Sequence, residues 1–391
     1  MAKEKKNQTA KGHLISICFF TVIGVILGLA MISFVEWQLP EGISSGEKIF
    51  RLCTTLVFLY LAVLIHIVFH EAGHLIFGLM SGYKFSSFRI GSHMLMKENG
   101  KLVHRKIMIA GTGGQCLMVP PEMVDGKFPV VLYNLGGSIV NLVVAALMIP
   151  AFAAVDKSSV FALFFFLFIT MGIITGLSNG IPMRTKTVDN DGYNAISLGK
   201  SKEAMRAFRI QMKVNEQLTK GIRTKDMPEA WFEVPSDEAM KNPMVATIGV
   251  YAASRLMDQH RFEGADNLID HLLEIETGMV ALHRNLLICD QIYLELIGQN
   301  RSDRVEELYT KELKKFMKAM KTFPSVIRLE YAYSLLAEHN FDNAAKHKAV
   351  FERVAATYPY PNDINTEREL MHIADEVSDR MVAHAGAMCY N

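Results

Sequence analysis

The fold is decided by the stretch LCTTLVFLYLAVLIHIVFHEAGH, residues 52–74. Between Leu52 and Phe69 it carries no charged side chain, and its length is close to the roughly 20 apolar residues that a helix needs to cross a bilayer. At its end come His70, Glu71 and His74. Ionisable groups are costly in an apolar helix and usually mark function. The sequence therefore predicts a membrane helix that carries a site at one end.

Three other segments are equally apolar and uncharged, so we expect about four membrane spans: Leu14–Val35, Leu52–Phe69, Pro129–Val155 and Ser159–Met183. Half of the 391 residues are hydrophobic, which suits a chain that is part membrane domain and part soluble domain. The first segment follows a basic start, but it is too long for the core of a signal peptide and no small-residue cleavage site follows it. We therefore expect it to be a retained anchor.

Lysine and arginine are distributed unevenly between these segments. They precede the first span and gather between the second and third, whereas the other two loops carry only Lys48, Arg51 and Lys157. Positive charge favours the cytoplasmic side, so the sequence predicts a multi-pass protein of the cell membrane with both termini in the cytoplasm. Spans two and four then both end at the cytoplasmic face.

Composition excludes two classes of site. The net charge of +1 provides no field that would attract nucleic acid, so we expect no nucleic-acid partner. The five cysteines are scattered, and no pair has the spacing of metal ligands. The sequence therefore predicts neither a disulfide framework nor a cysteine-based zinc site.

The segment HEAGH, residues 70–74, has the pattern His-Glu-x-x-His. Residues i and i+4 share one face of a helix, so the imidazoles of His70 and His74 can reach one zinc ion. Glu71 is then beside the metal, where it can accept a proton from the attacking water. His66 lies one turn earlier, but about 12 Å along the helix axis separates it from His74, too far for one ion to bind all three. We therefore expect His66 to pack in the helix bundle or to support the metal ligands, and not to bind the metal itself.

Zinc needs at least one more protein ligand and an open position for water. Candidates lie where the fourth span ends, in residues 179–182 and 189–192. By the predicted topology, this end faces the same side of the membrane as the two histidines. Two aspartates, Asp189 and Asp191, compete for the ligand position.

These motifs resemble those of the site-2 protease family, which comprises intramembrane zinc metalloproteases of the M50 type. That family pairs the histidine motif with a later Asn-x-x-Pro stretch ending in Asp-Gly, and Asn179, Pro182, Asp191 and Gly192 match it. The eight residues between Pro182 and Asp191 are more than the family's usual linker has.

A third family signature, Ala-Gly-Pro-x-x-Asn, is matched less closely. Residues 136–141 match it at Gly137 and Asn141 but lack its alanine and proline. The three signatures follow in the family's order, and the resemblance covers roughly residues 50–195.

The resemblance implies an enzyme, a zinc metalloendopeptidase that cleaves membrane-embedded or membrane-proximal substrates by means of a zinc-activated water. It implies zinc as the cofactor, and it favours Asp191 over Asp189 because a glycine follows Asp191. The implied metal ligands are His70, His74 and Asp191, and Glu71 is the implied catalytic base.

The resemblance also implies how an unwound substrate is held. Residues 87–109 are interrupted by Asn99-Gly100, a strong hairpin signal, and this hairpin resembles the membrane-associated sheet that such proteases place near the active site. A strand edge would satisfy the backbone groups of the substrate, and Asn141 and Asn179 would do so through their amides. The expected partners are membrane proteins or peptides and the lipid bilayer.

From about residue 193 the chain becomes charged and amphipathic. Ala265, Val305 and Ala344 recur about every 40 residues in similar surroundings, which indicates a tetratricopeptide-like helical repeat, although an ordinary helical bundle is the alternative. The sequence therefore predicts a mainly α fold: a membrane helix bundle with a small β-hairpin, followed by a soluble helical repeat. The predicted domains are a membrane-embedded metalloprotease at 1–192 and a cytoplasmic tetratricopeptide-like domain at 193–391. The second could bind a cytoplasmic regulator or a substrate segment.

A second function is compatible with these features. The chain could be a non-proteolytic membrane scaffold whose metal is structural and whose helical repeat recruits partners. Glu71 speaks against it, because a structural metal site needs no base.

Overall fold

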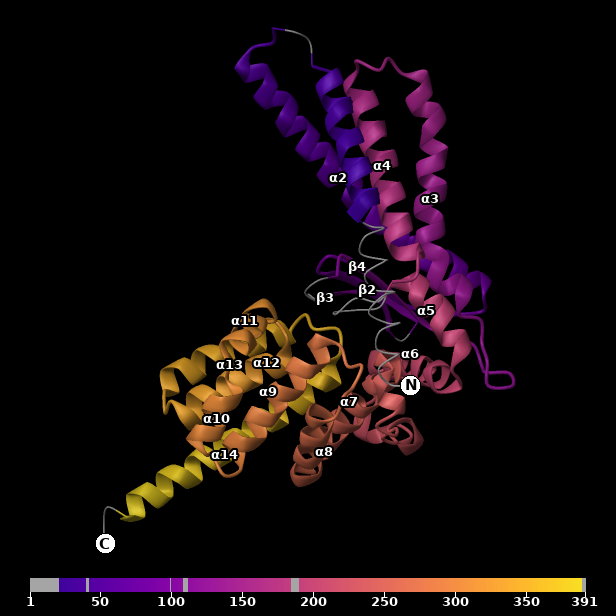
Figure 1. The fold of residues 1–391 in the computed structure, drawn as a ribbon. Coiled ribbons are helices and arrows are strands. Elements are labelled where there is room, and N and C mark those ends of the chain that lie inside the picture. The colour runs from indigo at the N-terminus through magenta and orange to yellow at the C-terminus, as the bar shows by residue number, and fades with distance from the viewer. Residues whose placement is uncertain (1–20, 40–41, 99, 108–111, 184–189, 389–391) are drawn as a thin grey trace. The chain divides into compact units, whose positions relative to one another are not determined.

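The computed structural model describes residues 21–39, 42–98, 100–107, 112–183 and 190–388. The chain forms two compact units (Figure 1). The first unit comprises Met1–Lys84 and Pro121–Ser201, and the second comprises Phe85–Pro120 and Lys202–Asn391. Residues 85–120 thus group with the C-terminal part of the chain. The predicted functional division near residue 192 stays a prediction.

Three long apolar helices pack against one another in the first unit: α2 (Ser45–Met80), α3 (Val131–Ala154) and α4 (Val160–Gly180). Each is long and apolar enough to cross a membrane, and large apolar side chains such as Leu56, Leu147 and Phe161 are exposed on them. Exposed apolar surface on this scale suits a lipid environment. The unit also contains an apolar helix at Thr21–Trp37, the short helix α5 (Asp191–Ser197) and a 3₁₀ turn, η1 (Leu198–Lys200). Part of the predicted span 14–35 lies outside the described residues, so the count of four spans stays a prediction.

Helix α2 is longer than the predicted span Leu52–Phe69. It begins after Ser44, whose hydroxyl accepts a hydrogen bond from the backbone N–H of Glu47 (3.2 Å), and it continues for 36 residues to Met80. At about 1.5 Å per residue its length is about 54 Å, well beyond a hydrocarbon core of about 30 Å. The histidine motif therefore lies within a continuous helix.

Helices α2 and α3 approach so closely that only glycine fits where they touch. A Cβ atom on Gly73 would lie 2.3 Å from the carbonyl oxygen of Gly136, and one on Gly136 would lie 2.5 Å from the carbonyl oxygen of Gly73. Small residues allow such backbone contact between membrane helices. Gly73 lies inside the histidine motif, so this contact brings the backbone of α3 directly beside the motif.

The second unit begins with a four-stranded sheet, whose strand order is β3-β2-β1-β4. The strands are β1 (Lys84–Ile90), β2 (His93–Glu98), β3 (Lys101–Lys106) and β4 (Gly114–Val119). The predicted hairpin at Asn99-Gly100 is confirmed: β2 and β3 pair antiparallel, with Glu98 opposite Lys101. Strands β1 and β4 extend it into a larger sheet than the predicted hairpin. Met94, Met96, Cys116 and Met118 are buried, and strands β2 and β4 contact helix α6.

Helices form the rest of the second unit. They are α6 (Lys202–Thr219), α7 (Pro243–Asp258), α8 (Phe262–Glu274), α9 (Ala281–Ile297), α10 (Ser302–Leu308), α11 (Lys311–Ala319), α12 (Pro324–Ala332), α13 (Phe341–Ala355) and α14 (Pro361–Met388). Short 3₁₀ turns lie at η2 (Thr224–Asp226), η3 (Glu229–Trp231) and η4 (Ala239–Lys241), and a π-helical turn, η5, lies at Tyr333–Ala337.

Three connections between these helices share one backbone feature. Each contains a non-glycine residue with positive φ, a conformation that side chains rarely adopt. Each such residue lies five positions before one of the small or apolar residues of the predicted repeat, and those three residues are all buried. The pairs are His260 (55°) and Ala265, Asn300 (50°) and Val305, and His339 (51°) and Ala344. The tetratricopeptide-like assignment itself stays a prediction.

Candidate metal centre

Three potential ligand atoms converge in the first unit. The Nε2 atoms of His70 and His74 lie 3.1 Å apart, and Oδ2 of Asp191 lies 3.0 Å from the first and 3.4 Å from the second. A tetrahedral zinc ion with bonds of about 2.0–2.1 Å separates neighbouring ligand atoms by about 3.3–3.4 Å. The three distances are close to the edges of such a tetrahedron, so these residues fit a zinc ion.

The ring of His74 is oriented by the backbone of α3. Its Nδ1 lies 2.7 Å from the carbonyl oxygen of Tyr133, which can only accept a hydrogen bond. Nδ1 therefore carries a proton, and Nε2 is the ring nitrogen that faces the site. A carbonyl partner of this kind is the usual way in which a metal-binding histidine is held.

The ring of His70 is contacted by Asn141 of α3. The Asn141 amide lies between two rings, 3.3 Å from Nδ1 of His70 and 3.3 Å from Nδ1 of His66. His66 is fully buried, and its Nε2 lies 2.9 Å from the carbonyl oxygen of Phe168 in α4. A half-turn of the amide gives Nδ1–H of His70 an oxygen acceptor and leaves Nε2 free for a metal. Asn141 thus connects His66 to His70.

The residues on either side of Asp191 hold it at the histidines. The Asn190 side chain accepts hydrogen bonds from the backbone N–H groups of Met183 and Tyr193 (both 2.9 Å), and it donates to the carbonyl oxygens of Ser178 (2.8 Å) and Ile181 (2.6 Å). It therefore caps α5 and ties it to the end of α4.

Gly192 makes this approach possible, because a Cβ atom there would lie 2.1 Å from the carbonyl oxygen of Gly180. The Asp-Gly pair of the sequence thus has a direct steric reason. Asp191 projects toward the two rings while the backbone that follows it lies against the end of α4.

The electrostatics of the site favour a bound cation. Burial opposes ionisation of Asp191, but its hydrogen bonds with His70 and His74 hold the pKa of the carboxyl well below its ordinary value. Asp191 is therefore a carboxylate at neutral pH. Its side chain is 23% exposed, against 13% for His70 and 10% for His74, so Asp191 is the most exposed of the three candidate ligands. Glu71 is buried and lies within electrostatic range of His74.

The other predicted site residues lie as follows. The Asn179 amide donates a hydrogen bond to the carbonyl oxygen of Thr175 (3.0 Å), one turn earlier in α4. Asp189, the competing ligand, lies outside the described residues. Sequence reasoning missed Asn190, although an asparagine before a helix start is a recognisable capping signal. It also missed Tyr133, which contacts His74 through its backbone carbonyl oxygen. The type of side chain at that position therefore gives no signal.

Comparison with known proteins gives one match. The profile of peptidase family M50 matches residues 58–348, which is about three quarters of the chain. The match extends well past residues 50–195, where the resemblance in the sequence motifs ended. No curated protein and no solved structure matches the chain. The family match includes the histidine motif and Asp191, and it covers most of the chain; this protein therefore belongs to peptidase family M50.

Proposed function

We propose that the protein is an intramembrane zinc metalloendopeptidase that cleaves membrane-embedded or membrane-proximal substrates. The observation that carries the proposal is the convergence of His70, His74 and Asp191 at distances of 3.0–3.4 Å. The two histidines lie on an apolar helix long enough to cross a membrane, and Asp191 follows another. Membership of a metallopeptidase family supports the same function. A scaffold with a purely structural metal would have no use for the buried carboxylate of Glu71.

Each residue has a defined task in this proposal. His70, His74 and Asp191 would hold zinc, which when bound lowers the pKa of a water molecule and polarises a carbonyl group. The carbonyl oxygen of Tyr133 keeps the proton of His74 on Nδ1. Glu71 accepts a proton from the attacking water and delivers it to the amine that leaves when the peptide bond breaks.

We further propose that Asn179 contacts the backbone of the unwound substrate. Among the residues that the structure describes, its amide makes a hydrogen bond only within its own helix, so the carbonyl oxygen of its side chain can serve a substrate N–H. Asn141, the other predicted substrate residue, would have to give up a contact with His66, His70 or Thr175 to do the same. We therefore assign Asn179 the larger part in substrate binding.

The proposed location is the cell membrane, with several spans and both termini in the cytoplasm. The uneven distribution of lysine and arginine between the apolar segments supports this orientation. It places the ends of α2 and α4, and hence the candidate metal centre, at the cytoplasmic side.

The test compares cells that express the wild-type chain or Glu71→Gln. We expect the substitution to abolish proteolysis and to leave zinc content unchanged, because it removes the base and keeps the size of the side chain. Peptide fragments derived from membrane proteins are measured in membrane fractions by mass spectrometry. Glu47→Gln, an exposed position on the same helix, is the matched control and should cleave like wild type. Equal fragment patterns from Glu71→Gln and wild type would refute the mechanism.

A further inference from the structure

The second unit contains a cavity of about 380 Å³ between its sheet and its helices. Met94, Gln115 and Leu117 line it from the sheet, and side chains of α6, α7, α9, α12 and α14 complete it. The backbone N–H of Lys106 donates to the carbonyl oxygen of Thr357 (2.9 Å), which fixes the sheet to the segment before α14. The volume lies within the roughly 300–1,000 Å³ that is typical of small-molecule sites.

Carboxylates outnumber cations on the wall of this cavity. Four acidic residues line it, Asp258, Asp290, Asp363 and Glu367, and Arg328 is its only arginine or lysine among the described residues. Arg328 pairs with both Asp290 and Glu367, so one positive charge serves two carboxylates. The wall is therefore short of positive charge.

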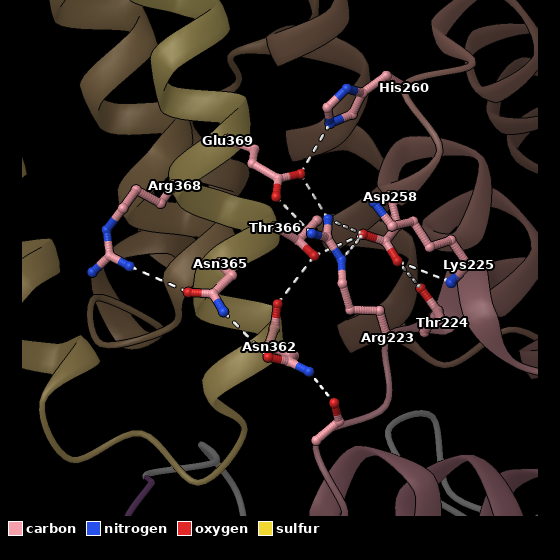
Figure 2. Close-up of polar contacts among 11 residues, drawn as sticks. Arg223, Thr224, Lys225, Asp258, His260, Asn362, Asn365, Thr366, Arg368 and Glu369 are labelled. Atoms are coloured by element: carbon pink, nitrogen blue, oxygen red, sulfur yellow. Dashed lines mark hydrogen bonds and ion pairs between the residues drawn. The ribbon is translucent and has the colours of Figure 1, made fainter.

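Arg223 does not line the cavity, and its positive charge is already paired with other carboxylates. Its guanidinium is shared between Asp258 (Nε to Oδ1, 2.9 Å) and Glu369 (Nη2 to Oε2, 2.8 Å), as Figure 2 shows. Thr366 and Thr224 also donate to Asp258. This network ties the end of α7 to α14 and satisfies Asp258 completely.

Asp363 is left without such a partner. No hydrogen bond to its carboxylate exists among the described residues, and it lies one helical turn from Glu367 on the same side of α14. Burial raises the pKa of Asp363 to about 7, helped by Glu367 and Asp258 and opposed by Arg223. Burial likewise raises the pKa of Glu367 to about 7, against the effect of Arg328. Both groups would ionise fully if a cation entered the cavity.

Two further features of the wall suit a cation. Tyr251, Tyr358 and Tyr360 all line the cavity and interact electrostatically with Asp363, and aromatic faces attract ammonium and guanidinium groups. His283 also lines it, and its buried Nδ1 has no hydrogen-bond partner among the described residues. Burial lowers the pKa of His283 to about 4, so its ring is neutral and offers an acceptor rather than a charge.

We propose that this cavity binds a ligand with one ammonium or guanidinium group on an apolar body, with Asp363 as its counter-ion. The cation would be surrounded by acceptors and aromatic rings, while apolar side chains such as Leu117, Val250 and Leu370 would contact the rest of the ligand. The group can be the side chain of a lysine or arginine in a peptide, or it can belong to a small amine. The site is separate from the candidate metal centre and does not depend on proteolysis.

The test is calorimetric titration of the full chain in detergent micelles at about pH 8. Phenethylamine and its neutral counterpart 2-phenylethanol probe the small-amine source. Acetyl-Phe-Lys-amide and acetyl-Phe-norleucine-amide probe the peptide source. In at least one pair we expect the cationic member to bind at least tenfold more tightly than the neutral one. The pair with the tighter cation identifies the source.

Variants connect this selectivity to the cavity. Asp363→Asn should abolish the preference for the cation, and Glu367→Gln should weaken it by a smaller factor. Asp342→Asn, an exposed aspartate outside the cavity, and Glu71→Gln should both keep it. Asp363→Asn should be at least as thermally stable as wild type, because it replaces a half-buried carboxyl that makes no hydrogen bond among the described residues. If Asp363→Asn keeps the preference, or if neither cation is preferred by the wild-type chain, the proposal is wrong.

Discussion

Replacing Gly192 by alanine tests whether the backbone after Asp191 sets the position of the third ligand. The new Cβ atom would lie 2.1 Å from the carbonyl oxygen of Gly180, 2.6 Å from its carbonyl carbon and 3.0 Å from that of Ile181. Ordinary contacts between such atoms are about 3.5 Å. The first residues of α5 must therefore move by on the order of 1 Å away from the end of α4.

A shift of this size is large compared with the tolerance of a metal site. Ligand distances must hold to within about 0.2 Å, and changes to groups that orient a ligand typically cost about 10–100-fold in metal affinity. The Asp191 oxygen is now 3.0 Å and 3.4 Å from the two Nε2 atoms, and the shift would change these distances by about a third. We expect zinc affinity to fall roughly 100-fold, with a loss of about 1–3 kcal/mol in stability from overpacking.

Chelator competition on the purified full chain measures this affinity. Gly199→Ala is the matched control, because nothing lies within 4 Å of the Cβ atom that it would add. It should bind zinc like wild type. If Gly192→Ala binds zinc as tightly as Gly199→Ala does, then the Asp191 segment does not hold the metal, and the assignment of the third ligand is wrong.

Three other outcomes are expected. Asn141→Leu removes the amide between His66 and His70 and should lower zinc affinity about 10–100-fold, whereas Asn179→Leu should leave it unchanged; chelator competition distinguishes them. Reporter fusions after residues 42, 157 and 391 should report outside, outside and inside, and an outside signal from the last would contradict the topology. Because the pKa of Asp363 is raised to about 7, the folded protein binds extra protons between about pH 4 and pH 7, so its free energy of unfolding falls as pH rises through this window. Measured by thermal unfolding across this pH window, the free energy of unfolding should fall less in Asp363→Asn than in wild type, by on the order of 1–2 kcal/mol after allowance for solvent screening. Equal dependence on pH in the two proteins would contradict the raised pKa.

The part of the site that follows from local rules could be predicted from the sequence. His70 and His74 meet because residues four apart share a helix face, which needs no knowledge of the rest of the fold. The hairpin at Asn99-Gly100 was likewise predictable, because its turn depends on two residues. Asp191 was expected only through a family resemblance, and the structure brings it to the histidines.

The remaining features depend on contacts between distant segments. The partner of His74 is the carbonyl group of Tyr133, and every residue except proline presents the same backbone atoms. The end of α2 at Met80 was not predicted, because hydropathy shows only which residues can lie in the hydrocarbon core. The helix itself continues as long as its backbone hydrogen bonds are made. The acidic cavity was not predicted because Tyr251 and Asp363 are separated by more than a hundred residues in the chain.

The chain passes between its two compact units three times, after Lys84, Pro120 and Ser201. A domain joined by a single linker can be removed by truncating the chain at that linker. The second unit cannot be removed in this way, because it is built from two separate segments of the chain. A stop codon near residue 200 would delete α6 to α14 and leave β1 to β4 behind, without the helix that β2 and β4 contact. The shortened product would keep residues 85–120 of the second unit, about a sixth of it, attached to the membrane helices. Its loss of activity would report misfolding, not the role of the deleted helices, so that role has to be studied by point substitution in the intact chain.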